Sequence, residues 1–524
     1  MKSLATLFGR LFAKSVAPVS TRRYVPTASR DAGARRDSLL GWTGPQTVNP
    51  AQAARERQLA QRRAADLAAN DWAATSALSA ITMNAVGSGL GPQSAIPPKL
   101  LGITVEEASR VGNELEWAFS NWSAHADAQG LLDFADLQLL GLRTMLSQGE
   151  MLHLAVRLPE QERMALGSPF SLAIQALRPQ RLQTPADLVY DPYIRDGIRF
   201  TPSGRPISYF IANPAPGMQD SFSSSEALTS ADFSEIPAAS AGRKNVFHLF
   251  RHEEEEQTRG FSIFAPGIIL FHNLSETLNN ELLSQAIAAS FSIFIATEDS
   301  SIAPAVGPQR EISDGEIVEK FERIDASRVY YGDRNQKPEI LESKRPSANF
   351  ASFVEIILRA MAASQGIPYE TLARDYSKTN YSSMRAALNE AWKVYGFYRN
   401  WFGRKYCQPI WEMVCEEAIL RGMVRLPPNA PSFQEARHLW CNADWRGPAR
   451  GFVDPVKEIQ AIILALENNL MTYGEAWAGQ GGDFGEAVET MKAEKTIIDA
   501  LRQGRQQAYV KPVQDTEGQD DEGQ

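Results

Sequence analysis

The side chains best suited to chemistry in this sequence are a histidine pair and the run of four acids that follows it. His248 and His252 have helical spacing, so on a helix both imidazoles could bind one metal ion. The acids at residues 253–256 could add oxygen ligands, but a contiguous run rarely holds its carboxylates in a fixed geometry. Residues 246–251 have the pattern of a strand edge. We therefore expect satisfied or surface histidines and a solvated acidic loop, with no metal site.

Motifs for nucleotide, metalloprotease and acyl-transfer chemistry are absent from the sequence. It has no Walker A motif, no HExxH, no GxSxG and no dinucleotide fingerprint. The glycine cluster at residues 87–91 lacks the Lys-Ser/Thr ending that a phosphate-binding loop needs. Glu435 and Asp444 could form a carboxylate pair, but no pattern places them in a cleft. We predict a protein that is not an enzyme and that binds no cofactor.

Composition narrows the class of protein further. The net charge of −9 argues against a protein coated with positive charge to hold nucleic acid tightly. Cys407, Cys415 and Cys441 lack CxxC spacing, which favours packing residues over a disulfide framework or a zinc site. No apolar stretch is long enough to cross a bilayer. A chain of 524 residues with 44% hydrophobic residues can form more than one domain.

Both ends of the chain have the composition of surface segments. Residues 1–63 are basic and poor in acids, and Arg10 and Lys14 interrupt the apolar start, so a secretory signal is a poor fit. We expect an arm that lies on a surface rather than in the core. The composition leaves two alternatives for this arm: it contacts DNA or a partner, or it is a solvated tail. Residues 511–524 are acidic, and we expect them to be disordered.

The first half of the chain changes from a helical to a strand pattern. Residues 64–158 are helical, and Thr104 with Glu107 predicts a capping box at the start of one helix. Residues 151–250 have short strands separated by turn signals, with a polar surface loop expected at residues 221–240. The sequence therefore predicts an α+β, helix-rich fold.

Two helices then flank an insert that begins with acids. The first helix is expected at residues 268–294, and the second at residues 348–365 with Ser347 as its cap and Gly366 at its end. Apolar and small residues at spacings of three and four predict the seam of the first helix. They are Leu278, Leu282, Ala286, Ala289 and Ile293.

An irregular polar segment at residues 367–381 leads to a very long helix that begins at Ser382 and ends at Gly422. Pro409 lacks an amide hydrogen, so we expect a kink there. Residues 424–505 are mostly helical. Five tryptophans fall on helix seams, which favours core or subunit-interface anchors over a base-stacking platform. They are Trp392, Trp401, Trp411, Trp440 and Trp445.

A series of short motifs follows in a fixed order through the second half. They are Gln257-Thr-Arg-Gly260, Tyr381-Ser-Ser-Met-Arg-Ala386 with Asn389-Glu390-Ala-Trp392, Ser432-Phe-Gln-Glu-Ala-Arg437 with Trp440 and Asn442-Ala-Asp-Trp445, Val456-Lys-Glu-Ile-Gln460, and Gly481-Gly-Asp-Phe484. With this order and spacing the chain resembles the lambda family of tailed-phage portal proteins. The resemblance covers most of the chain, although residues 203–240 carry no matching motif.

The resemblance implies a portal-type subunit with wing, stem, clip and crown, which assembles into a ring, typically dodecameric, with an axial channel. The implied parts are a basic N-terminal arm at 1–63, a wing at 64–260, stem helices at 261–296 and 347–366, a clip insert at 297–346, a tunnel loop at 367–381, a long kinked wing helix at 382–423, a crown and C-terminal helical region at 424–510 and an acidic tail at 511–524.

The function implied by the resemblance is a conduit at one capsid vertex for DNA packaging and ejection. The implied partners are further copies of the chain, double-stranded DNA, terminase, capsid and scaffold proteins, and head-completion or tail proteins, with no membrane. Assembly in the host cytoplasm would precede residence in the virion. A separate terminase motor hydrolyses ATP in this family, which agrees with the missing Walker A motif.

A conduit must touch DNA without holding it, because a ring repeats every contact many times. We expect Arg374 and Lys378 of the tunnel loop to face phosphates, with solvated cations paired to Asp375 or Glu370 as the alternative. Their expected neutral neighbours are Tyr376, Thr379 and Asn380. The acids of the clip could meet a basic face of terminase or a head-completion protein, or could simply be solvated. They are Glu298, Asp299, Glu311, Asp314 and Glu316.

Two other functions stay open at this point. Another structural head protein, such as a minor head or connector protein, would share the class, but the helix–insert–helix–loop–long-helix order favours a portal. A DNA-packaging enzyme, such as a terminase subunit with nuclease activity, would need a nucleotide cradle and a carboxylate cluster that binds metal. Neither is visible in the sequence.

Overall fold

A computed structural model of the chain describes residues 50–213, 228–290, 293–296, 311–313, 316–318, 329–332, 349–451, 454–482 and 484–509. The chain divides into two compact units. Unit 1 comprises residues 1–82, 140–155 and 175–394, and unit 2 comprises residues 83–139, 156–174 and 395–524. Three of the divisions fall inside helices, and two inside strands. The helices are α3 (Trp72–Ala85), α6 (Phe134–Gln148) and α11 (Tyr381–Phe402), and the strands are β2 (Glu150–Arg157) and β3 (Leu172–Leu177).

Unit 1 combines helices with small sheets, most of them antiparallel. A four-stranded sheet has the order β4 (Ile194–Arg195), β5 (Ile198–Phe200), β6 (Pro206–Ala212), β7 (Phe233–Pro237). Strand β10 (Val246–Phe250) pairs antiparallel with β2 (Glu150–Arg157), and β8 (Ala239–Ser240) with β9 (Arg243–Lys244). A parallel pair joins β11 (Ile293–Ala296) to β14 (Val329–Gly332), and β12 (Glu311–Ser313) pairs with β13 (Glu316–Val318).

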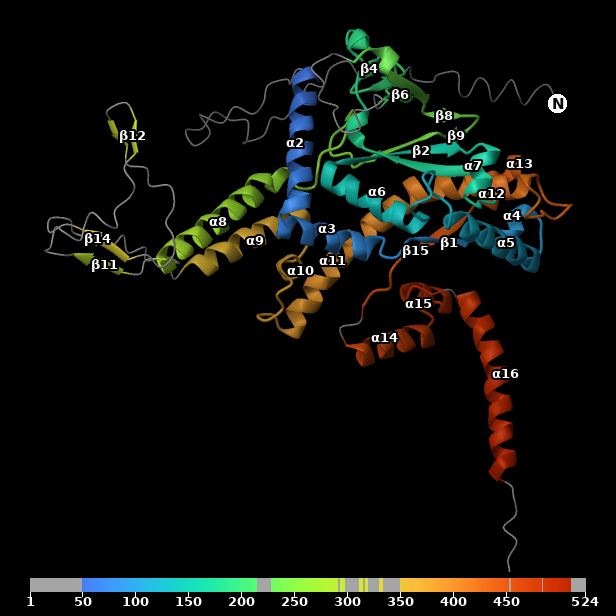
Figure 1. Ribbon diagram of the computed structural model, residues 1–524. Helices are drawn as coiled ribbons and strands as arrows, with labels where there is room; N and C mark the ends of the chain where they lie inside the picture. Colours follow the sequence, from blue (N-terminus) through green and yellow to red (C-terminus); the bar gives the residue numbers. More distant parts are fainter. Residues whose placement is uncertain are drawn as a thin grey trace, which may run out of the picture. The chain divides into compact units, whose positions relative to one another are not determined.

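The helices of unit 1 include an antiparallel pair, α8 (Ile268–Ser290) and α9 (Phe350–Gln365), which lie side by side (Figure 1). The preceding helix α2 (Pro50–Asn70) also contacts α8. Gly366 has φ 69°, the left-handed conformation that ends α9, and the short helix α10 (Tyr369–Ala373) follows. These elements bring residues 374–380 to the start of α11.

Unit 2 is built around aromatic side chains. Helices α5 (Val105–Ser123) and α12 (Gln408–Leu420) pack together, and the rings of Phe119 and Trp411 lie 5.4 Å apart in an edge-to-face arrangement. Strand β1 (Gly91–Ser94) pairs with β15 (Ala443–Arg446). The remaining elements of the chain are α4 (Pro98–Leu101), α7 (Glu160–Ala165), β3 (Leu172–Leu177), α13 (Phe433–Trp440), α14 (Pro455–Glu467), α15 (Tyr473–Gly479) and α16 (Phe484–Tyr509).

The long helix in unit 2 changes its winding before the proline. Residues Gly403–Cys407 form a π-helical turn between α11 and α12, and Pro409 follows at the start of α12. The irregularity in the long helix is thus a widened turn just before Pro409, and the kink predicted at Pro409 itself stays a prediction. Trp411 and Trp440 are fully buried, as expected of core anchors.

Several local predictions are confirmed. Thr104 and Glu107 form a complete capping box, and the helices and strands expected in the first half are present. All three cysteines are free and buried. His248 lies in strand β10 and bonds to Glu150. His252 is exposed and stacks on Phe250 with ring centroids 4.3 Å apart.

The expected surface arm at residues 1–63 is wrong in its last part. Helix α2 begins at Pro50, and Arg57 and Gln61 are buried. Arg57 donates to the half-buried Asp196 at 3.1 Å, so a charge that looked solvated in the sequence has a partner far along the chain. Residues 1–49 and the acidic tail lie outside the described residues.

The predicted seam of the first long helix is wrong at one position. Leu282 is 64% exposed, whereas its neighbour Glu281 is 6% exposed. The buried face instead follows Phe271, Leu274 and Glu281. Of the other predicted seam residues, Leu278 is half-buried, and the side chains of Ala286, Ala289 and Ile293 lie outside the described residues.

Three further boundaries differ from expectation. The helix expected at residues 268–294 ends at Ser290, and Ile293–Ala296 is a strand. The expected surface loop at 221–240 contains strands β7 and β8, and residues 221–227 lie outside the described part. Segment 367–381 is not wholly irregular, because α10 lies within it. The predicted cap Ser347 is outside the described residues, and Asn349 occupies the cap position of α9.

Candidate nucleic-acid interface

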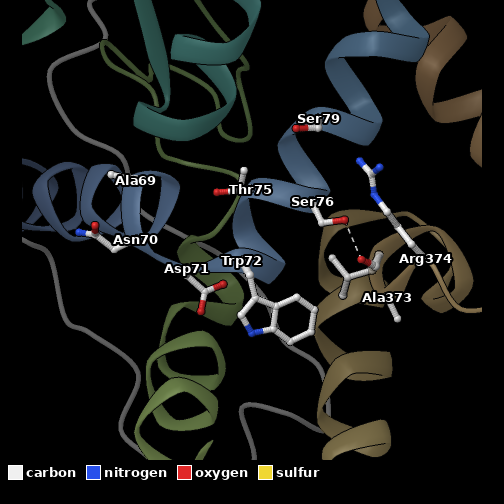
Figure 2. A pocket seen from close by; sticks show the side chains of 10 residues that line it. Ala69, Asn70, Asp71, Trp72, Thr75, Ser76, Ser79, Ala373 and Arg374 are labelled. Carbon is white, nitrogen blue, oxygen red and sulfur yellow. Dashed lines mark hydrogen bonds between the residues drawn. The ribbon is translucent and has the colours of Figure 1, made fainter. Parts of the chain in front are cut away.

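The candidate loop, residues 374–380, is exposed but fixed at its start. Leu372 is 1% exposed and anchors α10 in unit 1. Its carbonyl oxygen accepts a hydrogen bond of 2.7 Å from the hydroxyl of Ser76 on α3 (Figure 2). The polar residues that follow are therefore presented from a rigid base rather than from a free segment.

Arg374 lies where α10 ends and lines a cavity. Its φ of 53° lies in the left-handed region, which residues other than glycine adopt rarely and only as single residues. The exposed side chain helps to form a cavity of about 460 Å³ (Figure 2). The other lining residues are Ala69, Asn70, Asp71, Trp72, Thr75, Ser76, Ser79, Leu372 and Ala373.

The acid in this cavity, Asp71, has other partners. One carboxylate oxygen accepts from the amide of Ala74 at 2.8 Å, and the other accepts from the hydroxyl of Ser275 at 2.7 Å. Asp71 thus caps α3 and ties it to α8. Within the described parts of the chain, Arg374 has no ion pair, so its positive charge is available to solvent or to a ligand.

Lys378 has a partner that the sequence did not indicate. Its amino group lies 3.1 Å from a carboxylate oxygen of Glu355 on α9. The other oxygen of Glu355 lies 2.7 Å from the guanidinium of Arg359. Arg359 also covers the ring of Tyr369 at 5.3 Å, and burial together with the nearby Glu355 raises the pKa of Tyr369. The alternative predicted pairing, with Asp375 or Glu370, is not the one observed.

The other residues of the loop define its shape. Asp375 accepts hydrogen bonds from the hydroxyl and the amide of Ser377, at 2.6 and 3.0 Å, and these bonds lower the pKa of Asp375. The hydroxyl of Thr379 donates to the carbonyl of Tyr376 at 2.9 Å. Asn380 accepts from the amide of Ser383 at 2.8 Å and so caps α11. The loop is a sequence of local turns with one paired and one unpaired cation.

The clip residues are only partly within the described chain. Glu311 and Glu316 begin strands β12 and β13, in which Glu311 pairs with Val318 and Glu316 with Ser313. Glu298, Asp299 and Asp314 lie outside the described residues. Their expected contact with a basic partner stays a prediction.

A buried charge cluster in unit 1 was missed by the sequence reasoning. Glu150 has no exposed surface, and Arg259 donates two hydrogen bonds to its carboxylate, one of 2.6 Å. His248 and Gln61 contact the same carboxylate at 2.9 and 2.7 Å. Burial alone would raise the pKa of Glu150, but Arg259 and the hydrogen bond from His248 outweigh it and hold that pKa well below its usual value.

Arg259 is fully satisfied in this cluster. Besides Glu150, it donates to the carbonyl oxygens of Leu182, Asp196 and Pro179 at 2.9, 2.8 and 3.1 Å. Together these bonds use all of the N–H donors that a guanidinium carries. Burial lowers the pKa of His248, although Glu150 opposes the shift, and burial lowers the pKa of His153 to about 3.

The motif Gln257-Thr-Arg-Gly260 is the sequence signal for this cluster. Thr258 donates to Asp196 at 3.0 Å, and Gln257 bonds to the carbonyl of Arg259 at 2.9 Å. Gly260 lies so close to Gly149 that a Cβ at residue 260 would come within 2.0 Å of the Gly149 carbonyl oxygen. Each residue of the motif therefore has a structural role, which explains why these types stand together.

No metal or membrane feature appears in the described residues. They contain no group of three or more His, Cys, Asp or Glu side chains arranged to hold a metal ion. None of the helices described is long and apolar enough to span a bilayer.

Known proteins similar to this chain include portal proteins of phages. A family model described as phage portal protein, lambda family, matches residues 35–399. The portal protein of Escherichia phage N15 is 25% identical over 469 residues, 86% of each chain. Portal protein B of Escherichia phage lambda is 27% identical over 446 residues, 81% of each chain. A chain in the virion of a native gene transfer agent particle is 15% identical, with 82% of this chain and 93% of that one covered, at a TM-score of 0.36.

Proposed function

The chain belongs to the lambda family of phage portal proteins, and from that premise we propose that the loop at residues 374–380 faces double-stranded DNA in the channel of a ring of its copies. Arg374 is exposed and has no ion pair within the described chain, which is the observation that supports the loop most directly. Lys378 and the polar groups of Tyr376, Thr379 and Asn380 complete the surface that the DNA would pass.

Weak contact suits a conduit better than strong contact. Each phosphate that a cation neutralises makes binding tighter and more salt-dependent, and a ring multiplies the contact. The loop carries Arg374, Lys378 and the acid Asp375, so its own charge is small. Such a surface guides the DNA backbone, reads no sequence and lets the duplex slide.

The wider assignment follows the family. We assign residues 64–260 and the long helix at 382–423 to a wing, helices α8 and α9 to a stem, the insert between them to a clip, and residues 424–510 with α13–α16 to a crown. The ring is taken to be dodecameric, at one vertex of the capsid, after assembly in the host cytoplasm. Terminase, capsid and scaffold proteins, and head-completion or tail proteins are the partners proposed for the outer surfaces.

The test is a double variant, Arg374→Ala with Lys378→Ala, in the full-length chain. We expect rings of normal size by light scattering and negative-stain imaging, with reduced DNA packaging or poorer DNA retention. Lys99→Ala with Arg205→Ala is the matched control, because it removes two exposed cations elsewhere and should leave packaging unchanged. Loss of the ring in the loop variant, or packaging equal to the wild type, would contradict the assignment.

A further inference from the structure

Glu355 is placed to control how much positive charge the loop can offer. It lies on α9, outside the loop, and each of its carboxylate oxygens meets a different cation. We propose that Glu355 limits the hold of the ring on DNA by keeping Lys378 and Arg359 in ion pairs, so that Arg374 is the main cation available to phosphate. This inference rests on the proposed function of the loop.

The acid is more deeply buried than the two cations that it contacts. The Glu355 side chain is 18% exposed, whereas those of Lys378 and Arg359 are 73% and 58% exposed. The carboxylate therefore lies beneath two charges that face solvent. A phosphate at the surface would meet cations that are already neutralised from below, and it would have to compete with Glu355 for both.

Arg359 is further restrained by an aromatic ring. Its guanidinium lies over Tyr369 of α10 at 5.3 Å, and a cation in that position is attracted to the ring face. The pairing with Glu355 has i,i+4 spacing on α9. The acid thus connects α9, α10 and the loop while it compensates their charge.

Arg374 lacks a compensating acid of this kind. Asp71, which lines the same cavity, uses both carboxylate oxygens for neutral donors, the amide of Ala74 and the hydroxyl of Ser275. The two loop cations are therefore not equivalent, although the sequence shows them only as two basic residues four positions apart. Arg374 is expected to contribute more to DNA contact than Lys378 in the unaltered protein.

The substitution Glu355→Gln tests the idea, since it keeps the size of the side chain and removes its charge. On assembled rings, we would measure binding of a short mixed-sequence DNA duplex by fluorescence anisotropy over a range of salt concentrations. Each additional phosphate contact per duplex steepens the slope of log K against log salt concentration by about 0.9. Between 1 M and 0.1 M salt, one such contact therefore increases the gain in affinity by a further factor of about eight. We expect at least one such increment in Glu355→Gln.

A second substitution identifies the route of the gain. Lys378→Ala should change binding little in the wild-type background, but in the Glu355→Gln background it should remove the share of the gain that Lys378 provides, and Arg359→Ala should remove the rest. Glu114→Gln is the matched control, because Glu114 pairs with the exposed Arg110 at 2.6 Å on α5 and its loss frees one cation away from the loop. That control should bind DNA as the wild type does.

The outcomes separate this inference from the function beneath it. If Glu355→Gln binds DNA no more tightly, or if neither Lys378→Ala nor Arg359→Ala reduces the gain, the role of Glu355 is refuted. If, in addition, Arg374→Ala with Lys378→Ala packages DNA normally, the proposed function of the loop fails as well. Impaired packaging in that double variant with no effect of Glu355→Gln would refute the compensation alone.

Discussion

Removing Arg259 should open the strands around Glu150, because it leaves a carboxylate charged and buried. Arg259 is 3% exposed and Glu150 has no exposed surface. The substitution Arg259→Met keeps much of the volume but deletes two bonds to the carboxylate and three to carbonyl oxygens. Breaking a buried ion pair by removing one partner costs about 3–5 kcal/mol. A typical domain has about 5–15 kcal/mol of stability, so the loss is a large part of the total.

Hydrogen–deuterium exchange measures this loss where it arises. Strands β2 and β10 pair antiparallel, with Phe250 opposite Glu150, so their amides report opening beside the cluster. A loss of about 3–5 kcal/mol corresponds to faster exchange by about two to four powers of ten, since 1.4 kcal/mol is a factor of ten. Arg110→Met is the control, because its exposed pair with Glu114 should be worth about 0.2–1 kcal/mol.

A double variant tests the physical reason. In Glu150→Leu with Arg259→Met the buried carboxylate is gone, although carbonyl oxygens and His248 lose partners and the buried Arg57 keeps only Asp196 as its ion-pair partner. We expect part of the protection to return, because replacing both partners by apolar groups costs less than removing one. Unchanged exchange in Arg259→Met, or a double variant no more protected than the single one, would show that the reasoning is mistaken.

Two further predictions concern the same region. Gly260→Ala should prevent the close approach to Gly149, because the new Cβ would meet the Gly149 carbonyl oxygen at 2.0 Å, and we expect little folded protein. The control Gly204→Ala, at a glycine with open space around it but a left-handed φ, should still fold, and protein yield and circular dichroism measure both outcomes. Burial lowers the pKa of His153 to about 3, whereas in the unfolded chain the pKa is near 6.5, so the unfolded chain binds more protons between these pH values. The free energy of unfolding should therefore fall as the pH drops through this window, by at most about 1.4 kcal/mol per pH unit. Urea midpoints measured across this range should depend less steeply on pH in His153→Leu than in the wild type, and equal slopes would exclude His153 as the cause.

Local sequence signals predicted much of the fold. Thr104 and Glu107 are three residues apart, so their capping box depends on neighbours alone, and Gly366 ends α9 by its own conformational freedom. Helix faces were harder to predict. Glu281 is buried and Leu282 exposed because packing within unit 1, rather than hydrophobicity, selects the face of α8.

The candidate site was predictable as a place but not as a set of contacts. Polar composition indicated an irregular segment at residues 367–381, within which the structure places the loop at 374–380, and the family resemblance gave a function to this segment. The partner of Lys378 lies 23 positions earlier, and the partners of Arg259 lie up to 109 positions away. Such pairs depend on how helices and strands meet in space, which spacing along the chain does not contain. The same reason explains why Arg57 was mistaken for a surface charge.

The π-helical turn at Gly403–Cys407 means that chain length, more than residue type, sets the alignment of the long helix. An i→i+5 turn holds one residue more than an i→i+4 turn, so the winding here takes up an extra residue. In the regular α-helix on either side, each residue advances the side chains by about 100°, so a deletion there would rotate everything after it by that angle. Phe402 and Ile410, on either side of the turn, are fully buried, so such a rotation would turn apolar side chains out of the core. A single-residue deletion should therefore be less damaging within the π-helical turn, which can change to α-helical winding, than in α12 itself.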